Sequence, residues 1–238
     1  MSSPSHGESS RVGRGGGQIV PRPDGWRSGS PAPWGSRPYG SSLDVVTVVG
    51  AVAARPSTPE DDLPVPPGVR PSAVLVALHD GPQGAEVVLT RRSWALTNHR
   101  GEVSFPGGRL EPGETPEAGA LREAHEEVAL DPGAVALVGR LPALSTVVSM
   151  SHIVPVVGRL DHRPALRPAT DEVDRILHVP LVALTAPEVF REERWGEPPL
   201  ERAISFFDLE DETIWGATAH ILVDLLTIVL DSSTRWAG

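Results

Sequence analysis

The sequence predicts an α+β protein in which a mixed β-sheet is sandwiched between helices. Three observations indicate this class. Short apolar runs rich in valine, isoleucine and leucine recur between turn residues from residue 73 to residue 208. An acidic helical segment interrupts these runs, and an apolar pattern with helical spacing follows them at residues 218–230. The chain has 238 residues, which is enough to bury one sizeable core.

The N-terminal region differs in composition from the rest of the chain. Residues 1–42 are rich in glycine, serine, proline and arginine and have no apolar periodicity. Such a segment cannot bury enough apolar surface to offset the entropy of ordering, so we expect a disordered tail. The aromatic residues Trp26, Trp34 and Tyr39 would then be exposed. The folded domain is expected to occupy residues 43–238.

The first expected elements of the domain lead to a β-hairpin. Residues 43–54 are apolar and suit a short helix or a strand, and the prolines of residues 55–70 indicate a connecting loop. Strands are expected at residues 73–78 and 85–90, because both runs are rich in valine and leucine. The glycines between them, in residues 80–84, predict the turn.

A short strand at residues 103–105 is expected to enter a glycine loop and then a helix at 115–128. Thr115 suits the N-cap, because its hydroxyl can accept a hydrogen bond from the first turn, and Pro116 suits the first helical position. Further strands are expected at residues 134–141, 152–159, 172–178 and 203–208. A loop with one helical turn is expected at 180–200 and a helix at 218–230.

Composition excludes several classes of protein. The net charge of −10 argues against binding of nucleic acid through a basic surface, although bound cations can still recruit phosphates. The chain has no cysteine, which excludes thiol catalysis, disulfides and cysteine-ligated zinc. No apolar run reaches membrane-spanning length and no signal-peptide core is visible, so we expect a cytoplasmic protein with no membrane partner. His152, His178 and His220 show no spacing typical of metal ligands. A monomer and a homodimer are both compatible with the sequence.

Three carboxylates form a stripe on the acidic helix. A helix advances about 100° per residue, so Glu123, Glu126 and Glu127 project from one face. Like charges at this spacing destabilise a helix. A hard divalent cation such as Mg²⁺ or Mn²⁺ removes that conflict, because it prefers carboxylate and carbonyl oxygens. The stripe therefore predicts a metal site; the alternative is a solvated acidic helix face.

The glycine loop and the acidic helix resemble the Nudix box. In that motif a glycine and a glutamate precede an Arg-Glu pair, which two adjacent glutamates follow. The positions in register are Gly108, Glu114, Arg122, Glu123, Glu126, Glu127 and Leu130. Two positions depart: Ala124 replaces a bulkier aliphatic residue and Ala129 replaces a glycine. The resemblance implies the Nudix fold and hydrolysis of a diphosphate linked to another moiety, usually a nucleoside.

The run before the box resembles the signature of coenzyme A diphosphatases. In that subfamily Leu-Thr-x-Arg-Ser precedes Leu-Arg-x-His-x-Gly, which runs into Phe-Pro-Gly-Gly. The matching positions are Leu89, Thr90, Arg92, Ser93, Leu96, His99, Gly101 and residues 105–108. Thr97 departs, since it stands where the subfamily usually has arginine. Further similarity at residues 171–173 and 214–219 extends the resemblance over about residues 71–230.

The resemblance implies a role for each box residue. Glu123 and Glu127 would ligate Mg²⁺ or Mn²⁺, with Glu126 as a further ligand or as a partner of bound water. The main-chain carbonyl of Gly108 would be the ligand from the loop, because glycine lets the backbone approach a cation closely. Arg122 would pair with a carboxylate and orient it.

The same resemblance implies residues for the substrate and for proton transfer. Arg92 is the candidate phosphate contact, since a planar guanidinium suits phosphate oxygens, and Ser93 and His99 belong to the same motif. A structural ion pair is the alternative for Arg92. The general base would be a box glutamate or Glu172, for which the alternative is an ordinary surface turn residue.

The expected reaction is metal-dependent hydrolysis of the diphosphate of coenzyme A or its derivatives. The products would be 3′,5′-ADP and 4′-phosphopantetheine or its acylated forms. The first alternative keeps the chemistry but uses ADP-ribose, NADH or a nucleoside triphosphate, and the departure at Thr97 leaves it open. The second alternative is a non-catalytic Nudix domain that binds a nucleotide and regulates a partner. The complete set of carboxylates argues against this second alternative.

Overall fold

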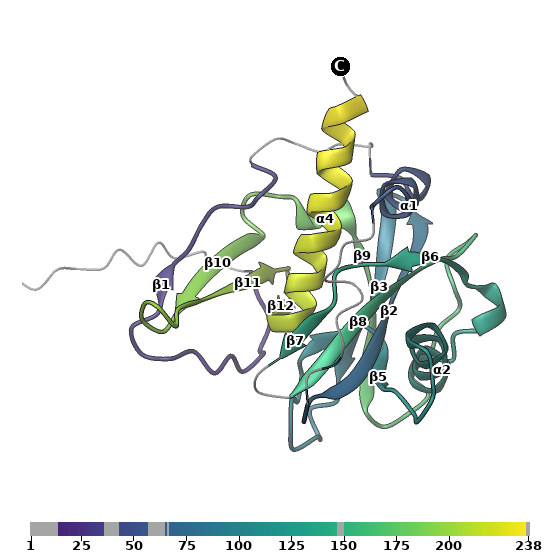
Figure 1. The fold of residues 1–238 in the computed structure, drawn as a ribbon, viewed down its shortest axis with the longest axis horizontal. Helices are drawn as coiled ribbons and strands as arrows, with labels where there is room; N and C mark the ends of the chain where they lie inside the picture. The colour runs from purple at the N-terminus through teal and green to yellow at the C-terminus, as the bar shows by residue number, and fades with distance from the viewer. Residues whose placement is uncertain (1–13, 36–42, 57–64, 66, 147–149, 237–238) are drawn as a thin grey trace, which may run out of the picture.

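A computed structural model describes residues 14–35, 43–56, 65, 67–146 and 150–236, and it has the α+β architecture shown in Figure 1. The helices are α1 (Val45–Ala53), α2 (Pro116–Val128), α3 (Leu181–Leu184) and α4 (Gly216–Trp236), with a 3₁₀ turn, η2, at Pro132–Ala134. The strands are β1 (Arg27–Ser28), β2 (Arg70–Gly81), β3 (Gly84–Arg92), β4 (Val103–Ser104), β5 (Gly107–Arg109), β6 (Ala136–Arg140), β7 (Leu144–Thr146), β8 (Ser151–Arg159), β9 (Val173–Pro180), β10 (Phe190–Trp195), β11 (Arg202–Asp208) and β12 (Thr213–Trp215).

A mixed sheet forms the centre of the molecule. Its strand order is β4-β3-β2-β8-β6, and β9, β5 and β7 pair with β3, β2 and β8 respectively. Strands β2 and β8 run parallel, with Val74 opposite Pro155, and the other described pairs of this sheet are antiparallel. The expected hairpin is confirmed as β2 and β3, and residues 43–54 form a helix, α1.

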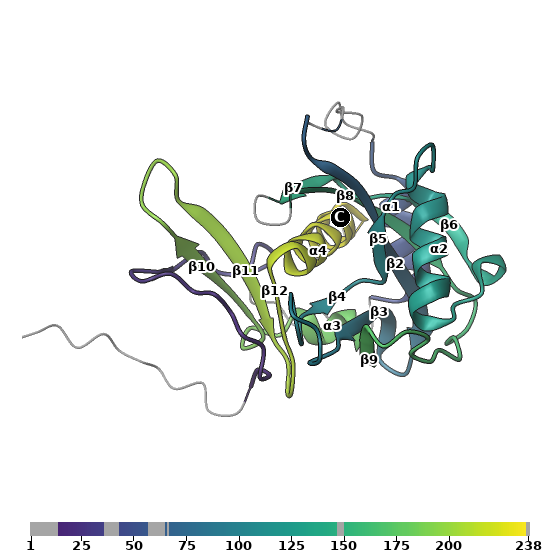
Figure 2. The same cartoon turned by 90° about the horizontal axis from the view of Figure 1, so that it is seen from below.

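Strand β2 separates two apolar cores, because successive side chains of a strand point to opposite faces. Ala73, Leu75 and Ala77 pack in one core with the apolar side of α2. Val76 and Leu78 pack in the other core with α1 and α4. Figure 2 shows α2 on one side of β2 and α4 on the other. The predicted sheet between helices is therefore confirmed.

A second, smaller sheet has the order β1-β10-β11-β12. The prediction of a loop over residues 180–200 is wrong for its second half, because β10 pairs antiparallel with β11, with Phe190 opposite Phe207. The sequence did not indicate this strand because four of the six residues of β10 are charged. Its Glu193 is nevertheless buried, and ion pairs with Arg22 and Arg191 neutralise it.

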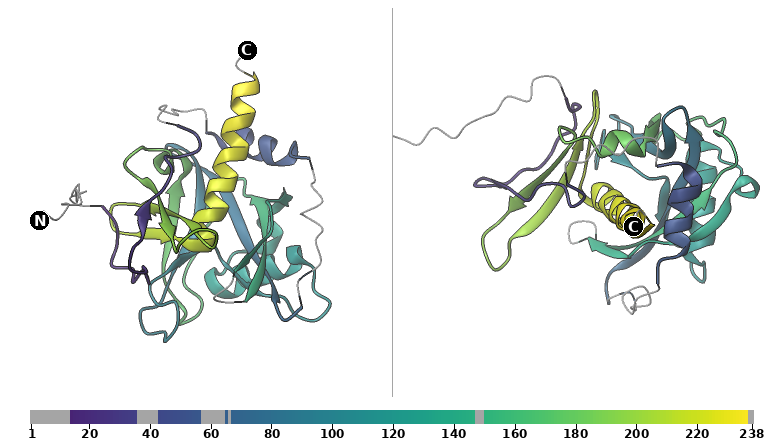
Figure 3. Two further views of the ribbon diagram at one scale, coloured as in Figure 1. Left: turned by 60° about the vertical axis from the view of Figure 1, so that its left-hand side comes forward. Right: turned by 90° about the horizontal axis from the view of Figure 1, so that it is seen from above.

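The prediction of a disordered tail is wrong for residues 14–35, which pack along the smaller sheet (Figure 3). Trp34 is only 8% exposed and lies against Phe190 at 5.2 Å and Phe207 at 6.2 Å between ring centroids. Gln18 accepts a hydrogen bond from the amide of Thr213 at 2.9 Å. These long-range contacts supply the burial that the local composition does not.

The other parts of the tail prediction have mixed outcomes. Strand β1 pairs with β10, with Arg27 opposite Arg194. Trp26 is exposed, as expected, and the guanidinium of Arg22 lies over its ring at 4.4 Å. Tyr39 lies outside the described residues, together with the rest of residues 1–13 and 36–42.

Candidate metal and diphosphate site

Helix α2 begins and ends through specific caps. The hydroxyl of Thr115 accepts a hydrogen bond from the amide of Ala118 at 3.3 Å, as the sequence predicts. The helix ends at Ala129, which has a left-handed conformation with φ 56°. The amide of Leu130 then donates to the carbonyl of Ala124 at 3.4 Å. A residue other than glycine in this conformation costs roughly 1–2 kcal/mol, so the departure at Ala129 leaves the helix end in place at an energetic cost.

Two glycines bring the preceding loop against the sheet and the helix. Strand β5 pairs with β2, with Gly107 opposite Val74 and Gly108 opposite Ala73. A Cβ on Gly107 would lie 2.4 Å from the carbonyl oxygen of Ala73, so no larger residue fits there. A Cβ on Gly108 would lie 2.5 Å from the carboxylate carbon of Glu123. The main chain at Gly108 is therefore next to the stripe, where the carry-over from the Nudix box places a carbonyl ligand.

Glu127 lies at the least solvated part of the site. The amide of Gly107 donates a hydrogen bond to its Oε2 at 3.2 Å. The pKa of Glu127 is raised to about 7, mainly by burial and also by the negative charges of Glu123 and Glu172. The Gly107 amide and the positive charge of Arg92 oppose this increase in pKa. The pKa of Glu127 thus depends on Gly107 of the loop, Glu123 of the helix, Arg92 of β3 and Glu172, which directly precedes β9.

Arg122 forms the centre of an ion-pair network on the exposed side of the helix. Its Nε and Nη2 donate to the two carboxylate oxygens of Glu114 at 2.9 and 3.0 Å. Its Nη1 donates to Glu123 at 3.0 Å and to Glu126 at 3.2 Å, and Nη2 also reaches the carbonyl of Arg109 at 3.0 Å. The hydrogen bond from Arg122 lowers the pKa of Glu114. The arginine thereby fixes Glu123 and ties the glycine loop to the helix.

Arg92 and Glu172 meet beside this helix. Nη2 of Arg92 donates to Oε2 of Glu172 at 3.3 Å, and the amide of Ser93 donates to the carbonyl of Glu172 at 2.7 Å. The pairing of β3 with β9 shifts register between Arg91 and Arg92, which redirects the Arg92 side chain relative to the strand. Its Nε is buried and finds no hydrogen-bond partner among the described residues. That unpaired donor suits an acceptor such as a phosphate oxygen.

Ser93 and His99 lie in the loop that follows β3. Oγ of Ser93 accepts a hydrogen bond from the amide of Ala95 at 3.3 Å, and Nδ1 of His99 lies 2.9 Å from Oε2 of Glu102. The amide of Gly101 donates to the carbonyl of Arg92 at 3.1 Å and anchors this loop. Ser93 and His99, which the resemblance assigns to the substrate, therefore lie in the loop that follows Arg92. The described hydrogen bonds of their side chains stay within the loop and do not reach the stripe.

The donor set of the stripe fits a hard divalent cation. Glu123 and Glu127 offer carboxylate oxygens, and burial, followed by the negative charge of Glu123, raises the pKa of Glu127. The three stripe carboxylates are not gathered around one point, because Arg122 holds Glu123 and Glu126 while the Gly107 amide holds Glu127. In the described part of the chain, one group of three His, Asp or Glu side chains has ligand atoms within 4.8 Å of one another, and it lies elsewhere, at His79, Glu86 and His178.

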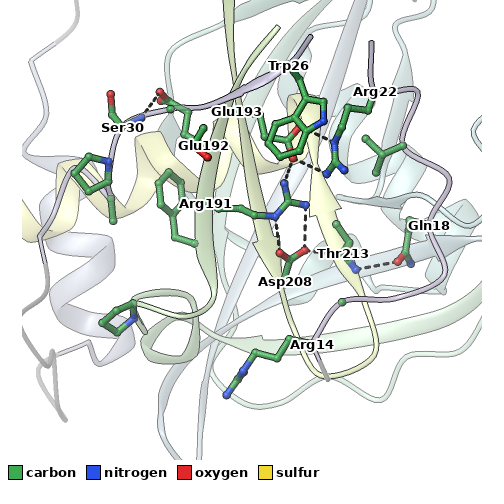
Figure 4. A pocket seen from close by; sticks show the side chains of 18 of the residues that line it. Arg14, Gln18, Arg22, Trp26, Ser30, Arg191, Glu192, Glu193, Asp208 and Thr213 are labelled. Atoms are coloured by element: carbon green, nitrogen blue, oxygen red, sulfur yellow. Dashed lines mark hydrogen bonds and ion pairs between the residues drawn. The ribbon is translucent and has the colours of Figure 1, made fainter. Parts of the chain in front are cut away.

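A cavity of about 1120 Å³ lies between the N-terminal segment and strands β10 and β11, away from the stripe (Figure 4). Its charged side chains are already paired: Nε of Arg191 lies 2.6 Å from Asp208, and Nη2 of Arg22 lies 2.5 Å from Glu193. The box residues to which the sequence assigns the chemistry do not line this cavity.

The fold and the site define a known class of protein. The family model described as the NUDIX domain matches residues 69–202, which is more than half of the chain. The chain belongs to this family.

Several relatives carry the family name. The chain is 38% identical over 167 residues to "Nudix hydrolase 22, chloroplastic" of Arabidopsis thaliana, covering 66% of this chain and 55% of that protein. It is 36% identical over 159 residues to the uncharacterized Nudix hydrolase NudL of Escherichia coli, covering 66% of this chain and 81% of that protein. The chain spans little more than half the length of the Arabidopsis relatives it matches.

Solved structures with Nudix names resemble this chain at low identity. A MutT/nudix family protein from Enterococcus faecalis has a TM-score of 0.45 and 17% identity, with 71% of this chain and 65% of that chain covered. The Nudix hydrolase RenU of M. smegmatis has a TM-score of 0.41 and 22% identity, with 47% and 71% covered. Similarity at this level says nothing about a substrate.

Two observations bear on cellular location. No helix in the described residues is long and apolar enough to cross a membrane. Two of the plant relatives are named as chloroplastic and mitochondrial proteins. A cytoplasmic location for this chain therefore stays a prediction.

Proposed function

We propose that this protein is a Mg²⁺- or Mn²⁺-dependent hydrolase that cleaves the diphosphate of coenzyme A or its derivatives. One observation carries the proposal: the segment that resembles the coenzyme A diphosphatase signature contains Arg92, whose Nη2 lies 3.3 Å from Oε2 of Glu172 and whose charge acts on Glu127. The arginine proposed to bind phosphate therefore lies near the carboxylates proposed to bind the metal. The Nudix hydrolase names of the relatives support the hydrolase class.

Breaking a diphosphate requires a water oxygen to bond to one phosphorus while the bridging oxygen leaves with the other. When bound at the stripe, the metal supplies charge neutralisation on the phosphate oxygens and a more acidic water. Glu123 and Glu127, with Glu126 and the Gly108 carbonyl, are the residues that would hold it. Arg122 positions Glu123 through the 3.0 Å hydrogen bond.

The remaining residues of the proposed site bind the substrate and accept a proton. Arg92 would contact a phosphate oxygen, and its Nε is a buried donor without a hydrogen-bond partner among the described residues. The side chain of Glu172 is 57% exposed, and its ion pair among the described residues is with Arg92, which a phosphate would attract away. Release of Glu172 from Arg92 would free a carboxylate to accept the proton of the attacking water. Glu127 is the competing candidate for this role.

A comparison of substrates tests the proposed specificity. Values of kcat/KM for coenzyme A, an acyl-coenzyme A, ADP-ribose, NADH and a nucleoside triphosphate are measured with Mg²⁺ and with Mn²⁺. We expect coenzyme A or its acyl form to exceed the other compounds by at least tenfold. A higher value for ADP-ribose, NADH or the triphosphate would move the proposal to that compound and would assign the departure at Thr97 a role in specificity. Binding of a nucleotide without turnover of any compound would support a regulatory domain.

A further inference from the structure

Two histidines and one glutamate meet on three neighbouring strands of the main sheet. His79 on β2 lies opposite Glu86 on β3, and His178 lies on β9, which pairs with the other edge of β3. Nε2 of His79 is 2.7 Å from Nδ1 of His178 and 3.7 Å from Oε2 of Glu86. The three side chains share the face of the sheet that carries Val88 and Ala77, since residues two apart on a strand point the same way.

The hydrogen bonds of His79 leave one ring nitrogen free to accept. His79 is fully buried, and its Nδ1 lies 3.0 Å from the carbonyl oxygen of Asp80. A carbonyl can only accept, so Nδ1 carries the hydrogen and Nε2 presents its lone pair to His178 and Glu86. A backbone carbonyl that holds the outer nitrogen of a histidine is the usual arrangement around histidines that bind metals.

The charge of Glu86 is not matched within the triad. Its side chain is 6% exposed, and a buried carboxylate is costly without a compensating charge. Nη1 of Arg163 approaches Oε2 of Glu86 at 3.2 Å, but the Arg163 side chain is 54% exposed and can swing into solvent. Nδ1 of His178 donates the hydrogen bond to Nε2 of His79 in this arrangement, and the other neutral tautomer of His178 places a lone pair on Nδ1.

We propose that His79, Glu86 and His178 bind a divalent transition-metal ion of the Zn²⁺ class. Two imidazoles and a carboxylate are a donor set that zinc accepts with a fourth position left open. Zinc–nitrogen bonds of ~2.0–2.1 Å in a tetrahedral site separate ligand atoms by about 3.4 Å. The 3.7 Å separation between His79 and Glu86 is close to that value, and the two rings need to part by less than an ångström. The ion would tie β2, β3 and β9 together.

This site is separate from the carboxylate stripe. The box loop pairs with β2 at Ser72, Ala73 and Val74, whereas His79 lies five residues farther along the same strand. At ~3.4 Å per residue that distance is about 17 Å. The two sites can therefore be tested independently, and the second does not depend on the proposed hydrolysis.

Metal titration tests the proposal. Untagged protein carrying Glu123→Gln, Glu126→Gln and Glu127→Gln, which removes the three stripe carboxylates, is titrated with Zn²⁺ by calorimetry, and its melting temperature is followed. We expect one equivalent to bind and the melting temperature to rise, because an ion that binds only the folded state stabilises it. His178→Gln and Glu86→Gln should each weaken Zn²⁺ at least tenfold. His220→Gln on α4, where the side chain is 57% exposed, should leave the affinity unchanged.

A second readout does not require the variants to fold. Co²⁺ bound by four ligands that include imidazoles absorbs visible light more strongly than Co²⁺ in water, so wild-type protein with Co²⁺ in place of Zn²⁺ reports the ligands directly. We expect that absorption, and we expect added Zn²⁺ to remove it. Absence of the absorption together with no Zn²⁺ binding, or equal Zn²⁺ affinity in His178→Gln, Glu86→Gln and their parent, would overturn the proposal. The triad would then be a hydrogen-bonded network without a metal.

Discussion

The amide of Gly107 donates a hydrogen bond to Oε2 of Glu127 across 3.2 Å, and this bond joins the glycine loop to the last turn of α2. Gly107 can occupy that position because it has no Cβ to collide with the carbonyl of Ala73, which would lie 2.4 Å away. The loop is thus held between the sheet and the acidic helix. The position of Glu127 depends on this contact, and so does its charge.

The pH dependence of stability should show the raised pKa of Glu127. Its pKa is raised from 4.5 to about 7, so the folded metal-free protein binds more protons than the unfolded chain between these values. The stability from this group is therefore fully present below about pH 4.5 and is lost as pH rises through about 7. The full shift corresponds to roughly 3 kcal/mol.

Urea unfolding in EDTA at about pH 5 and about pH 8 measures this effect. We expect Glu127→Gln to lose less stability between the two pH values than wild type, and Glu210→Gln, at an exposed turn, to behave as wild type. Equal losses in wild type and Glu127→Gln would show that this carboxylate is already ionised at low pH.

Arg122→Lys should reduce activity although the substitution keeps the positive charge. Lysine cannot reproduce the fork that holds Glu114, Glu123 and Glu126 together. We expect activity to fall about 10–100-fold and the metal concentration for half-maximal activity to rise. Steady-state kinetics over a Mg²⁺ series measures both quantities. Arg202→Lys, at the exposed first residue of β11, is the matched control. An equal fall in activity in this variant would contradict the positioning role of Arg122.

Ala129→Gly should stabilise the protein. Ala129 has φ 56°, a conformation that glycine adopts without steric cost. We expect a gain of about 1 kcal/mol in the free energy of unfolding. Ala118→Gly, at an exposed position inside the same helix, should instead cost roughly 0.5–1 kcal/mol. Urea denaturation measures both, and two losses of similar size would contradict the left-handed helix end.

The N-terminal segment should contribute to stability. Trp34 is 8% exposed and packs against Phe190 and Phe207, so Trp34→Ala should cost about 3 kcal/mol or more. Trp26 is 41% exposed, so Trp26→Ala should cost less than about 1 kcal/mol. Thermal unfolding compares the two variants. Equal melting temperatures would show that residues 14–35 do not pack as described.

The sequence predicts the elements whose signals are local. Helix α2 was predictable because Thr115 caps it, Pro116 starts it and its acidic residues follow a known motif. Strand β10 was not, because its charged side chains look solvent-exposed until their partners are known. The buried Glu193 forms an ion pair with Arg22, which is 171 residues away in sequence. The local pattern contains no information about such a partner.

The candidate sites divide in the same way. The Nudix box lies in one contiguous run, so the sequence names its residues, and their roles stay predictions until they are tested. The triad of His79, Glu86 and His178 joins positions as far apart as 99 residues through the pairing of three strands. The spacing of the histidines in the sequence therefore does not indicate that the ligand atoms of His178, His79 and Glu86 lie within 4.8 Å of one another. Only strand register brings the two histidines together.

The most direct measurement is mass spectrometry of the products formed from coenzyme A with Mg²⁺ or Mn²⁺, for wild type and Glu127→Gln side by side. We predict 3′,5′-ADP and 4′-phosphopantetheine from wild type and almost none from Glu127→Gln, with circular dichroism showing both proteins folded. The same products from both proteins would contradict the assignment of Glu127 to the metal site. No product from wild type would contradict coenzyme A as the substrate.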